Sequence, residues 1–274
     1  MKKTILFLII IFCTNTTFGQ SDWDLIKKGN ICFSESNYNC SIRNYKKALK
    51  QMDPDHIQRI YVLSNLGTSY WRNKNQTAAL KTYLKAKLID SKDVGLLKNI
   101  ASLYRAMDSL DSSIRVYKLA SSLEPKNLDI LINKAYSKSL NGDTIGAVND
   151  YNIALKIDPK YYPARTNLAI IKFAKKDTIG AFEDFDEMVN LLPNEPNTYN
   201  NRADFYLKTG NYEKALKDIN IAIRLDKKFA LAFMTRGEIY LKMNKKSKAK
   251  KDFKKSIKLG LQTKVVFDLL KKSQ

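Results

Sequence analysis

The sequence contains few of the residues on which turns, disulfide frameworks and metal sites depend. Its 274 residues include 10 Gly, 6 Pro, 3 Cys and a single His. So little Gly and Pro argues against a turn-rich β-protein, and three cysteines are too few for a disulfide framework. One histidine without a second His or a Cys at ligand spacing does not make a metal site, so we expect neither a metal nor a cofactor. Abundant Leu, Ile, Ala, Lys and Tyr favour an all-α fold.

Motifs that carry catalysis are also missing from the sequence. No glycine-rich loop that would cradle a phosphate occurs, and no Ser or Cys stands in a nucleophile motif. Asp and Glu are spread over positions expected on outward helix faces, where surface ion pairs are commoner than acid–base dyads. The histidine, His56, is expected to be a solvated loop residue. We therefore predict that the chain is not an enzyme.

The first nineteen residues do not fit a folded domain. A positive start at Lys2 and Lys3 is followed by an apolar run over residues 5–13 and a polar stretch that ends at Gly19. This order is typical of a secretory signal peptide. We expect cleavage after Gly19 and an exported protein, either periplasmic or associated with the cell surface.

Two alternatives to a cleaved signal peptide remain open. The segment could stay as a membrane anchor, although its nine apolar residues are about half of the roughly 20 that span a bilayer. The chain could also be a lipoprotein modified at Cys13, although Phe12 is bulky where that signal needs a small residue. No later segment is long and apolar enough to suggest a membrane span.

A 34-residue period runs through most of the chain. Small residues recur at Gly67, Ala101, Ala135, Ala169, Ala203 and Gly237, and a second small series follows twelve residues later, at Ala79, Ser113, Ala147, Ala181, Ala215 and Ala249. Four residues beyond the second series stand Tyr83, Tyr117, Tyr151, Phe185, Ile219 and Phe253. Small residues let two helices approach, and the large residue one turn later fills the gap on the same face. Each unit is predicted to be a helix pair whose apolar face the next pair buries.

The best-preserved unit resembles the tetratricopeptide-repeat family. It carries Leu63, Leu66, Gly67, Tyr70, Ala79 and Tyr83 at the family's spacing. The resemblance implies an all-α solenoid, a right-handed superhelix of antiparallel helix pairs over residues 20–274, with about seven repeats. The expected repeats are 22–56, which is degenerate, 60–93, 94–127, 128–161, 162–195, 196–229 and 230–261, with a capping helix over 263–272.

An asparagine recurs at one register of five successive units. The residues are Asn65, Asn99, Asn133, Asn167 and Asn201, which the resemblance places on the first helix of each unit, facing the concave side. Asn both donates and accepts, so a row of them can pair with the backbone of an extended peptide. The alternative is that they bond within their own solenoid. Trp71, Tyr136 and Phe173 stand at neighbouring inner-surface positions.

The chain is strongly basic, and the excess is concentrated at its C-terminal end. Residues 227–274 hold 15 Lys or Arg against 3 Asp or Glu, a net charge of +12. The crowded lysines include Lys245, Lys246, Lys250, Lys251 and Lys254. They indicate either a solvated end cap or a surface for anionic lipid headgroups or acidic polysaccharide. The signal peptide disfavours nucleic acid as a partner.

Two further cysteines, Cys32 and Cys40, fall late in one expected helix and early in the next. We hypothesise that they form a disulfide, since export offers an oxidising compartment; the alternative is a pair of half-buried thiols. Taken together, the sequence predicts a non-catalytic scaffold that binds a partner protein or an extended peptide in a concave groove. A basic adaptor that associates with an anionic envelope surface is the alternative.

Overall fold

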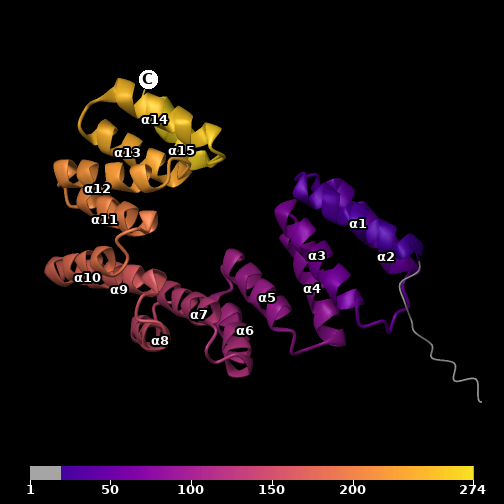
Figure 1. The fold of residues 1–274 in the computed structure, drawn as a ribbon. Helices are drawn as coiled ribbons and strands as arrows, with labels where there is room; N and C mark the ends of the chain where they lie inside the picture. Colours follow the sequence, from indigo (N-terminus) through magenta and orange to yellow (C-terminus); the bar gives the residue numbers. More distant parts are fainter. Residues whose placement is uncertain (1–19, 274) are drawn as a thin grey trace, which may run out of the picture. The chain divides into compact units, whose positions relative to one another are not determined.

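The computed structural model describes residues 20–273, and this part of the chain consists of fifteen helices with no strand (Figure 1). The helices are α1 (Gln20–Ser34), α2 (Tyr38–Gln51), α3 (Arg59–Arg72), α4 (Gln76–Ile89), α5 (Val94–Ala106), α6 (Leu110–Leu123), α7 (Leu128–Leu140), α8 (Thr144–Ile157), α9 (Tyr162–Ala174), α10 (Thr178–Leu191), α11 (Pro196–Lys208), α12 (Tyr212–Leu225), α13 (Ala230–Lys242), α14 (Lys246–Lys258) and α15 (Lys264–Lys272). The expected signal peptide, with its cleavage site and Cys13, lies outside the described residues.

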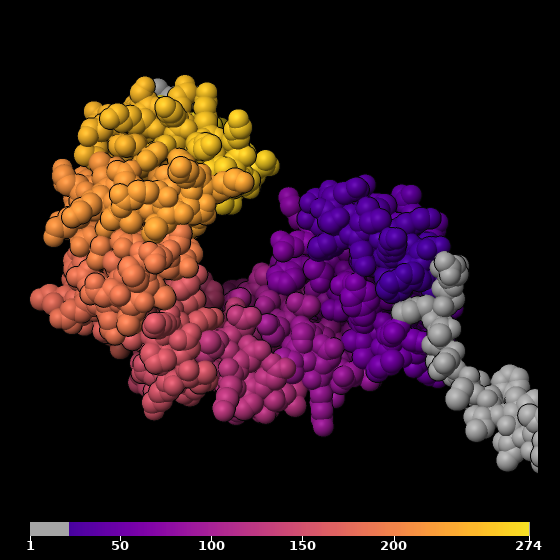
Figure 2. All heavy atoms as spheres, in the orientation of Figure 1, coloured from indigo at the N-terminus to yellow at the C-terminus, as the bar shows by residue number. Residues whose placement is uncertain are grey.

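The chain divides into two compact units, residues 1–125 and residues 126–274. Unit 1 contains α1–α6 and unit 2 contains α7–α15. Within each unit consecutive helices form antiparallel pairs, and successive pairs follow one another in chain order, as the colours of Figure 2 indicate. This arrangement confirms the predicted fold class, an all-α tetratricopeptide-repeat fold.

The small and large residues of the period meet inside each helix pair. A Cβ atom added to Gly67 would lie 2.5 Å from the ring of Tyr83, and one added to Gly237 would lie 2.5 Å from the ring of Phe253. Both rings are completely buried. Gly29 stands against Tyr45 in the same way in the first pair, which the sequence marked as degenerate. The pattern therefore has the predicted physical cause, because any larger residue would push the two helices apart.

The turn within each pair has a fixed backbone conformation. One residue in each turn has a positive φ, at Ser36, Lys74, Asp108, Gly142, Lys176, Gly210 and Asn244. Only two of these are glycines, although glycine adopts this conformation most readily. The following helix begins with a polar cap in several pairs: Asn75 Oδ1 accepts from the N–H of Ala78, and Asp143 Oδ1 accepts from that of Gly146.

The connection between the first two pairs is longer than the others. Seven residues, 52–58, separate α2 from α3, whereas four residues, 90–93, separate α4 from α5. Arg59, the first residue of α3, reaches back across this linker, and its Nη1 donates to the carbonyls of Leu49 and Met52 at 2.9 Å each. The guanidinium thereby satisfies carbonyl groups that the end of α2 leaves without helical partners.

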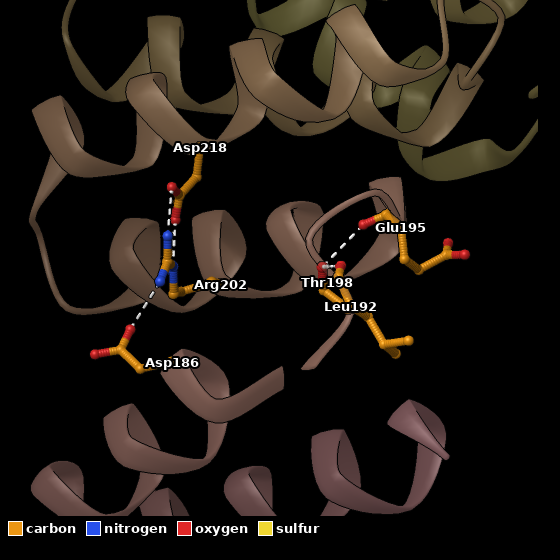
Figure 3. Close-up of polar contacts among 6 residues, drawn as sticks. All are labelled: Asp186, Leu192, Glu195, Thr198, Arg202 and Asp218. Atoms are coloured by element: carbon orange, nitrogen blue, oxygen red, sulfur yellow. Dashed lines mark hydrogen bonds and ion pairs between the residues drawn. The ribbon is translucent and has the colours of Figure 1, made fainter. Parts of the chain in front are cut away.

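Unit 2 joins the two helices of its pairs through buried ion pairs. Arg202 of α11 forms two parallel bonds to Asp218 of α12, at 2.7 and 2.8 Å, and a third to Asp186 of α10 at 2.9 Å (Figure 3). Arg236 of α13 repeats this geometry with Asp252 of α14, at 2.7 and 2.9 Å. Arg202 therefore links α12 to α10. Arg236, whose Nη1 also donates to Asn220 Oδ1 at 2.9 Å, links α14 to α12.

The electrostatics of this clamp favour the charged arginine. Burial alone lowers the pKa of Arg202, but the hydrogen bonds and charge of Asp218, followed by those of Asp186, reverse this and raise it. Asp218 is 3% exposed. A carboxylate buried to this degree needs a paired cation, which Arg202 supplies in bidentate form. Figure 3 also shows Thr198 in the first turn of α11, where its hydroxyl donates to the carbonyl of Glu195 at 2.8 Å.

Candidate interaction surfaces

The described residues offer no arrangement for metal chemistry. Among residues 20–273 no group of three His, Cys, Asp or Glu side chains is placed to hold a metal ion. His56 lies in the linker before α3, where its Nδ1 accepts from the backbone N–H of Gln58 at 3.1 Å. None of the described helices combines the length and the apolarity that crossing a bilayer requires.

The five asparagines all lie on the first helix of their pairs, and four of them donate hydrogen bonds inside the chain. In unit 2, Asn133 Nδ2 donates to the carbonyl of Asp129 at 2.7 Å, and Asn167 Nδ2 donates to that of Pro163 at 2.8 Å. Both bonds stay within one helix turn. The Asn side chain can donate two bonds and accept two, so the bond of Asn167 to Pro163 does not exhaust that side chain.

The other two internal bonds connect neighbouring repeats. Asn99 Nδ2 donates to Ser64 Oγ at 3.4 Å in unit 1, and Asn201 Nδ2 donates to Thr166 Oγ1 at 3.0 Å in unit 2. Each partner hydroxyl lies on the first helix of the preceding pair. These contacts correspond to the alternative that the sequence left open, in which the asparagines bond within their own solenoid.

Asn65 and Asn99 line one cleft of about 420 Å³, which we call the asparagine cleft. Ser64, Ile57 and Tyr61 contribute to the same wall, and Ile57 and Tyr61 are 62% and 50% exposed. Exposed apolar and aromatic side chains beside amide groups are suited to a peptide, whose backbone is polar and whose side chains are often apolar. The sequence pattern indicated the asparagines but missed Ile57, which lies in the longer linker outside the 34-residue register, and Tyr61, because later repeats have no aromatic residue at its register.

The predicted aromatic positions differ in exposure. Trp71 is half-buried and packs against the core of unit 1. Phe173 is also half-buried, and its ring lies edge-on to Phe205 with 4.9 Å between the centroids. Tyr136 is 43% exposed. Of the three, Tyr136 presents the largest exposed fraction to a partner, whereas Trp71 and Phe173 also contribute to packing.

The basic C-terminal surface lies at and around α14. Lys245, Lys246, Lys251 and Lys254 are exposed and Lys250 is half-buried. The acidic residue of this helix, Asp252, is buried and paired with Arg236, so it does not offset the lysines at the surface. Two other lysines of α14 lie over aromatic rings of α13, with Lys248 Nζ 5.6 Å from the centroid of Tyr240.

The Sγ atoms of Cys32 and Cys40 lie at disulfide distance, 2.08 Å apart, and join the end of α1 to the start of α2. The Cα atoms are 5.7 Å apart, within the usual range for a bridge. Asn44 Nδ2 lies 3.4 Å from Cys40 Sγ. The geometry of the first pair is thus compatible with the hypothesised bond.

Comparisons with known proteins agree with the repeated helix pairs seen in the structure. Models described as Tetratricopeptide repeat match residues 60–93, 196–229 and 230–259. A tetratricopeptide repeat protein from Parabacteroides merdae is 25% identical, with a TM-score of 0.72 over 93% of this chain and 99% of that one. Yeast Tom70 is 14% identical, with a TM-score of 0.63 over 95% of this chain and 65% of that one.

A third similar structure is that of the APC/C hetero-tetramer Cut9–Hcn1. The matched chain is 16% identical, with a TM-score of 0.54 over 91% of this chain and 55% of that one. Tom70 and this structure establish likeness of fold only. The matching repeat models, the 34-residue period and the paired helices together show that the chain belongs to the tetratricopeptide-repeat family, whose members are in general non-catalytic scaffolds for protein interactions.

Proposed function

We propose that this protein is a non-catalytic scaffold that holds an extended segment of a partner protein against the first helices of its repeats. The observation that carries the proposal is the recurrence of asparagine at one register, with Asn65 and Asn99 in a single cleft beside exposed apolar side chains. The hetero-tetrameric assembly of Cut9–Hcn1, a protein of similar fold, supports an interaction role of this kind.

The hydrogen bonds within the chain determine which asparagines can be tested cleanly. The bond of Asn167 ends on a carbonyl of its own helix, so replacing Asn167 by Ala leaves the contacts between helices intact. Ala is also the better helix former. Asn201, by contrast, ties α11 to α9, and its removal should lower the free energy of unfolding by roughly 0.5–1.5 kcal/mol.

The experiment begins by identifying the partner through photo-crosslinking in living cells from Tyr61, with Leu88 as the control position because it is 88% exposed on α4 and does not line the asparagine cleft. Affinity for the captured partner is then measured with the triple variant Asn99→Ala, Asn133→Ala and Asn167→Ala. We expect each single change to weaken binding at most about tenfold and the triple change to weaken it much more.

Melting of the same variants distinguishes recognition from structure. We expect the triple variant to melt only slightly below the parent protein, because its Asn99→Ala change removes one bond between neighbouring repeats, and we expect Asn201→Ala to melt lower than the parent for the same reason. If the triple variant melts far below the parent, the asparagines act within the fold. If it melts normally and binds with unchanged affinity, the partner is not recognised through the asparagines.

We further propose that the protein works outside the cytoplasm. The apolar run at residues 5–13 and the proximity of Cys32 and Cys40, whose Cα atoms are 5.7 Å apart, support this location, because disulfides persist in oxidising compartments. Intact-mass analysis of the protein from the cell envelope should give a chain that begins at Gln20 and lacks two hydrogens. A full-length chain, or free thiols at Cys32 and Cys40, would contradict the proposal.

The surface at α14 supports a second candidate function, association with an anionic envelope surface. Its lysines are exposed apart from the half-buried Lys250, and the helix's acidic residue, Asp252, is already paired. Replacing Lys246, Lys250 and Lys254 by Gln should reduce binding to phosphatidylglycerol vesicles without changing the melting temperature. Binding of this kind should fall steeply between low and high salt, whereas binding in the asparagine cleft should weaken only modestly. Absence of vesicle binding by the parent protein would rule out this candidate.

A further inference from the structure

A second cleft, of about 740 Å³, lies in unit 1 and is lined by α2, α3, α4 and the long linker. We call it the lysine cleft. Seven of its lining residues are Lys or Arg, and none is Asp or Glu. Its apolar part includes Leu63, Leu66 and Tyr70 of α3. Because the lysine cleft combines apolar residues with a basic rim, we expect its occupant to carry both apolar and anionic groups.

The basic residues follow both walls of the lysine cleft. On α2, Arg43, Lys46 and Lys50 recur at three- and four-residue intervals, and on α4, Lys81 and Lys85 stand one turn apart. Residues at these intervals share a helix face. The row on α2 therefore extends over about 10 Å at 1.5 Å per residue.

These cations are not neutralised by the fold. No acidic side chain in residues 22–273 forms an ion pair with Lys46, Lys81 or Lys85. Lys46 Nζ instead lies 5.9 Å from the centroid of the Tyr70 ring, above the apolar part of the cleft. Like charges gathered in a cleft repel one another and attract a partner of opposite charge.

The lysine cleft and the asparagine cleft use different residues of α3. Leu63, Leu66 and Tyr70 line the lysine cleft, whereas Ser64 and Asn65 line the asparagine cleft. The lysine cleft also borders the long linker, since Pro54 and Arg59 belong to its lining. The two surfaces can therefore be changed independently.

We propose that the lysine cleft binds an acidic amphipathic peptide segment of a partner protein, separately from the asparagine cleft. The distribution of charge selects this occupant. A lipid or fatty acid concentrates its charge in one headgroup, which would leave the rest of two cationic rows without counter-charge. A peptide with Asp or Glu on both edges of an apolar stripe places carboxylates along both rows and its apolar side chains on Leu63 and Leu66.

The test uses a fluorescent helical peptide of fourteen residues, with Leu at positions i, i+3, i+4 and i+7 and Glu at the flanking positions. Its binding to the full chain is followed by anisotropy. Lys46→Gln, Lys81→Gln and Lys85→Gln together should weaken binding about tenfold. The matched control, Lys27→Gln, Lys28→Gln and Lys118→Gln, removes the same charge from exposed residues of unit 1 outside the cleft, and should change affinity by less than about twofold.

Further binding measurements distinguish this proposal from the proposed groove function and from a lipid occupant. The triple asparagine variant should bind the Leu–Glu peptide as the parent does, so failure of the proposed groove function would leave this result intact. Palmitate and phosphatidylglycerol vesicles are offered in parallel. The proposal is overturned if the peptide does not bind, if both lysine variants weaken binding equally, or if palmitate or vesicles bind at the cleft and the peptide does not.

Discussion

The two units differ in the residues that join the two helices of a repeat at one register. At the register where unit 2 has Arg202 with Asp218 and Arg236 with Asp252, unit 1 has Ile100 with Val116. The two residues of each pair are 16 positions apart and lie on the two helices of one repeat. In these pairs the helix–helix contact is therefore apolar in unit 1 and ionic in unit 2, whereas the α9–α10 pair of unit 2 has Leu168 and Asp184 at the same register.

Charge is also unevenly distributed within unit 2 itself. Residues 126–226 contain 14 Lys or Arg and 14 Asp or Glu, whereas residues 227–274 contain 15 and 3. Buried ion pairs thus occur both in the segment with equal numbers of basic and acidic residues and in the strongly basic C-terminal segment. Since a buried ion pair contributes little over a well-packed apolar pair, its main energetic signature should be the cost of breaking it.

The largest expected effect comes from breaking one clamp. Asp218→Ala leaves the Arg202 guanidinium buried without its bidentate partner, and we expect a loss of about 3–5 kcal/mol in the free energy of unfolding. Asp186→Ala is the matched control, because Asp186 contacts the same guanidinium but its side chain is 54% exposed. It should cost about 1 kcal/mol or less. Urea denaturation and hydrogen exchange of α11 and α12 provide the measurement.

Converting the clamp of unit 2 into the pair of unit 1 sharpens the same comparison. The double change Arg202→Ile and Asp218→Val copies Ile100 and Val116, and should bring stability back to within about 1–2 kcal/mol of the parent. A double variant as unstable as Asp218→Ala would mean that the ionic contact contributes more than the apolar one in this register.

A smaller effect should separate the first and last helix pairs at alkaline pH. Burial raises the pKa of Tyr45 to about 12, so the folded protein favours the neutral phenol, which donates to Asn30 Oδ1 at 2.6 Å. Phe253 holds the corresponding place in the pair of α13 and α14 and does not titrate. The stabilising contribution of Tyr45 is complete below pH 10 and is lost as the pH rises toward 12, by roughly 1–3 kcal/mol.

The measurement for Tyr45 compares the parent with Tyr45→Phe by denaturation at pH 8 and at pH 11.5. The difference in stability between the two proteins should shift in favour of Tyr45→Phe at the higher pH, while the common effect of lysine deprotonation cancels. A constant difference across this range would contradict the expected shift.

The smallest effect concerns the turns within the pairs. Lys176 has φ of 67° and Gly210, at the same place in the next repeat, has φ of 79°. Lys176→Gly should stabilise the protein by about 0.5–1 kcal/mol, and Gly210→Ala should destabilise it by about 1 kcal/mol. Thermal melting of the two variants should therefore move in opposite directions, and movement in the same direction would show that the backbone conformation is not the controlling factor.

The helix pairs and their order could be predicted from the sequence because their causes are local or periodic. Apolar spacing fixes which face of a helix is buried, and the small residue at Gly67 sits 16 positions from the large one at Tyr83, a separation that returns in later repeats. Asn75 and Asp143 cap helices through bonds to residues three positions on. Contacts between residues at such short and fixed separations can be predicted directly from the sequence.

The surfaces were decided by tertiary structure. The lysine cleft combines Lys46 and Lys81 across a linker of irregular length, so no fixed spacing reveals it. The only signals were the runs of basic residues and the spacing from Ala48 to Gly67, which is four residues longer than that from Ala86 to Ala101. The register located the asparagines, but whether an amide bonds its own helix, as Asn167 does, or a neighbouring one, as Asn201 does, depends on the acceptor nearby. Side-chain partners follow from distances between helices, which a repeating sequence does not specify for each member.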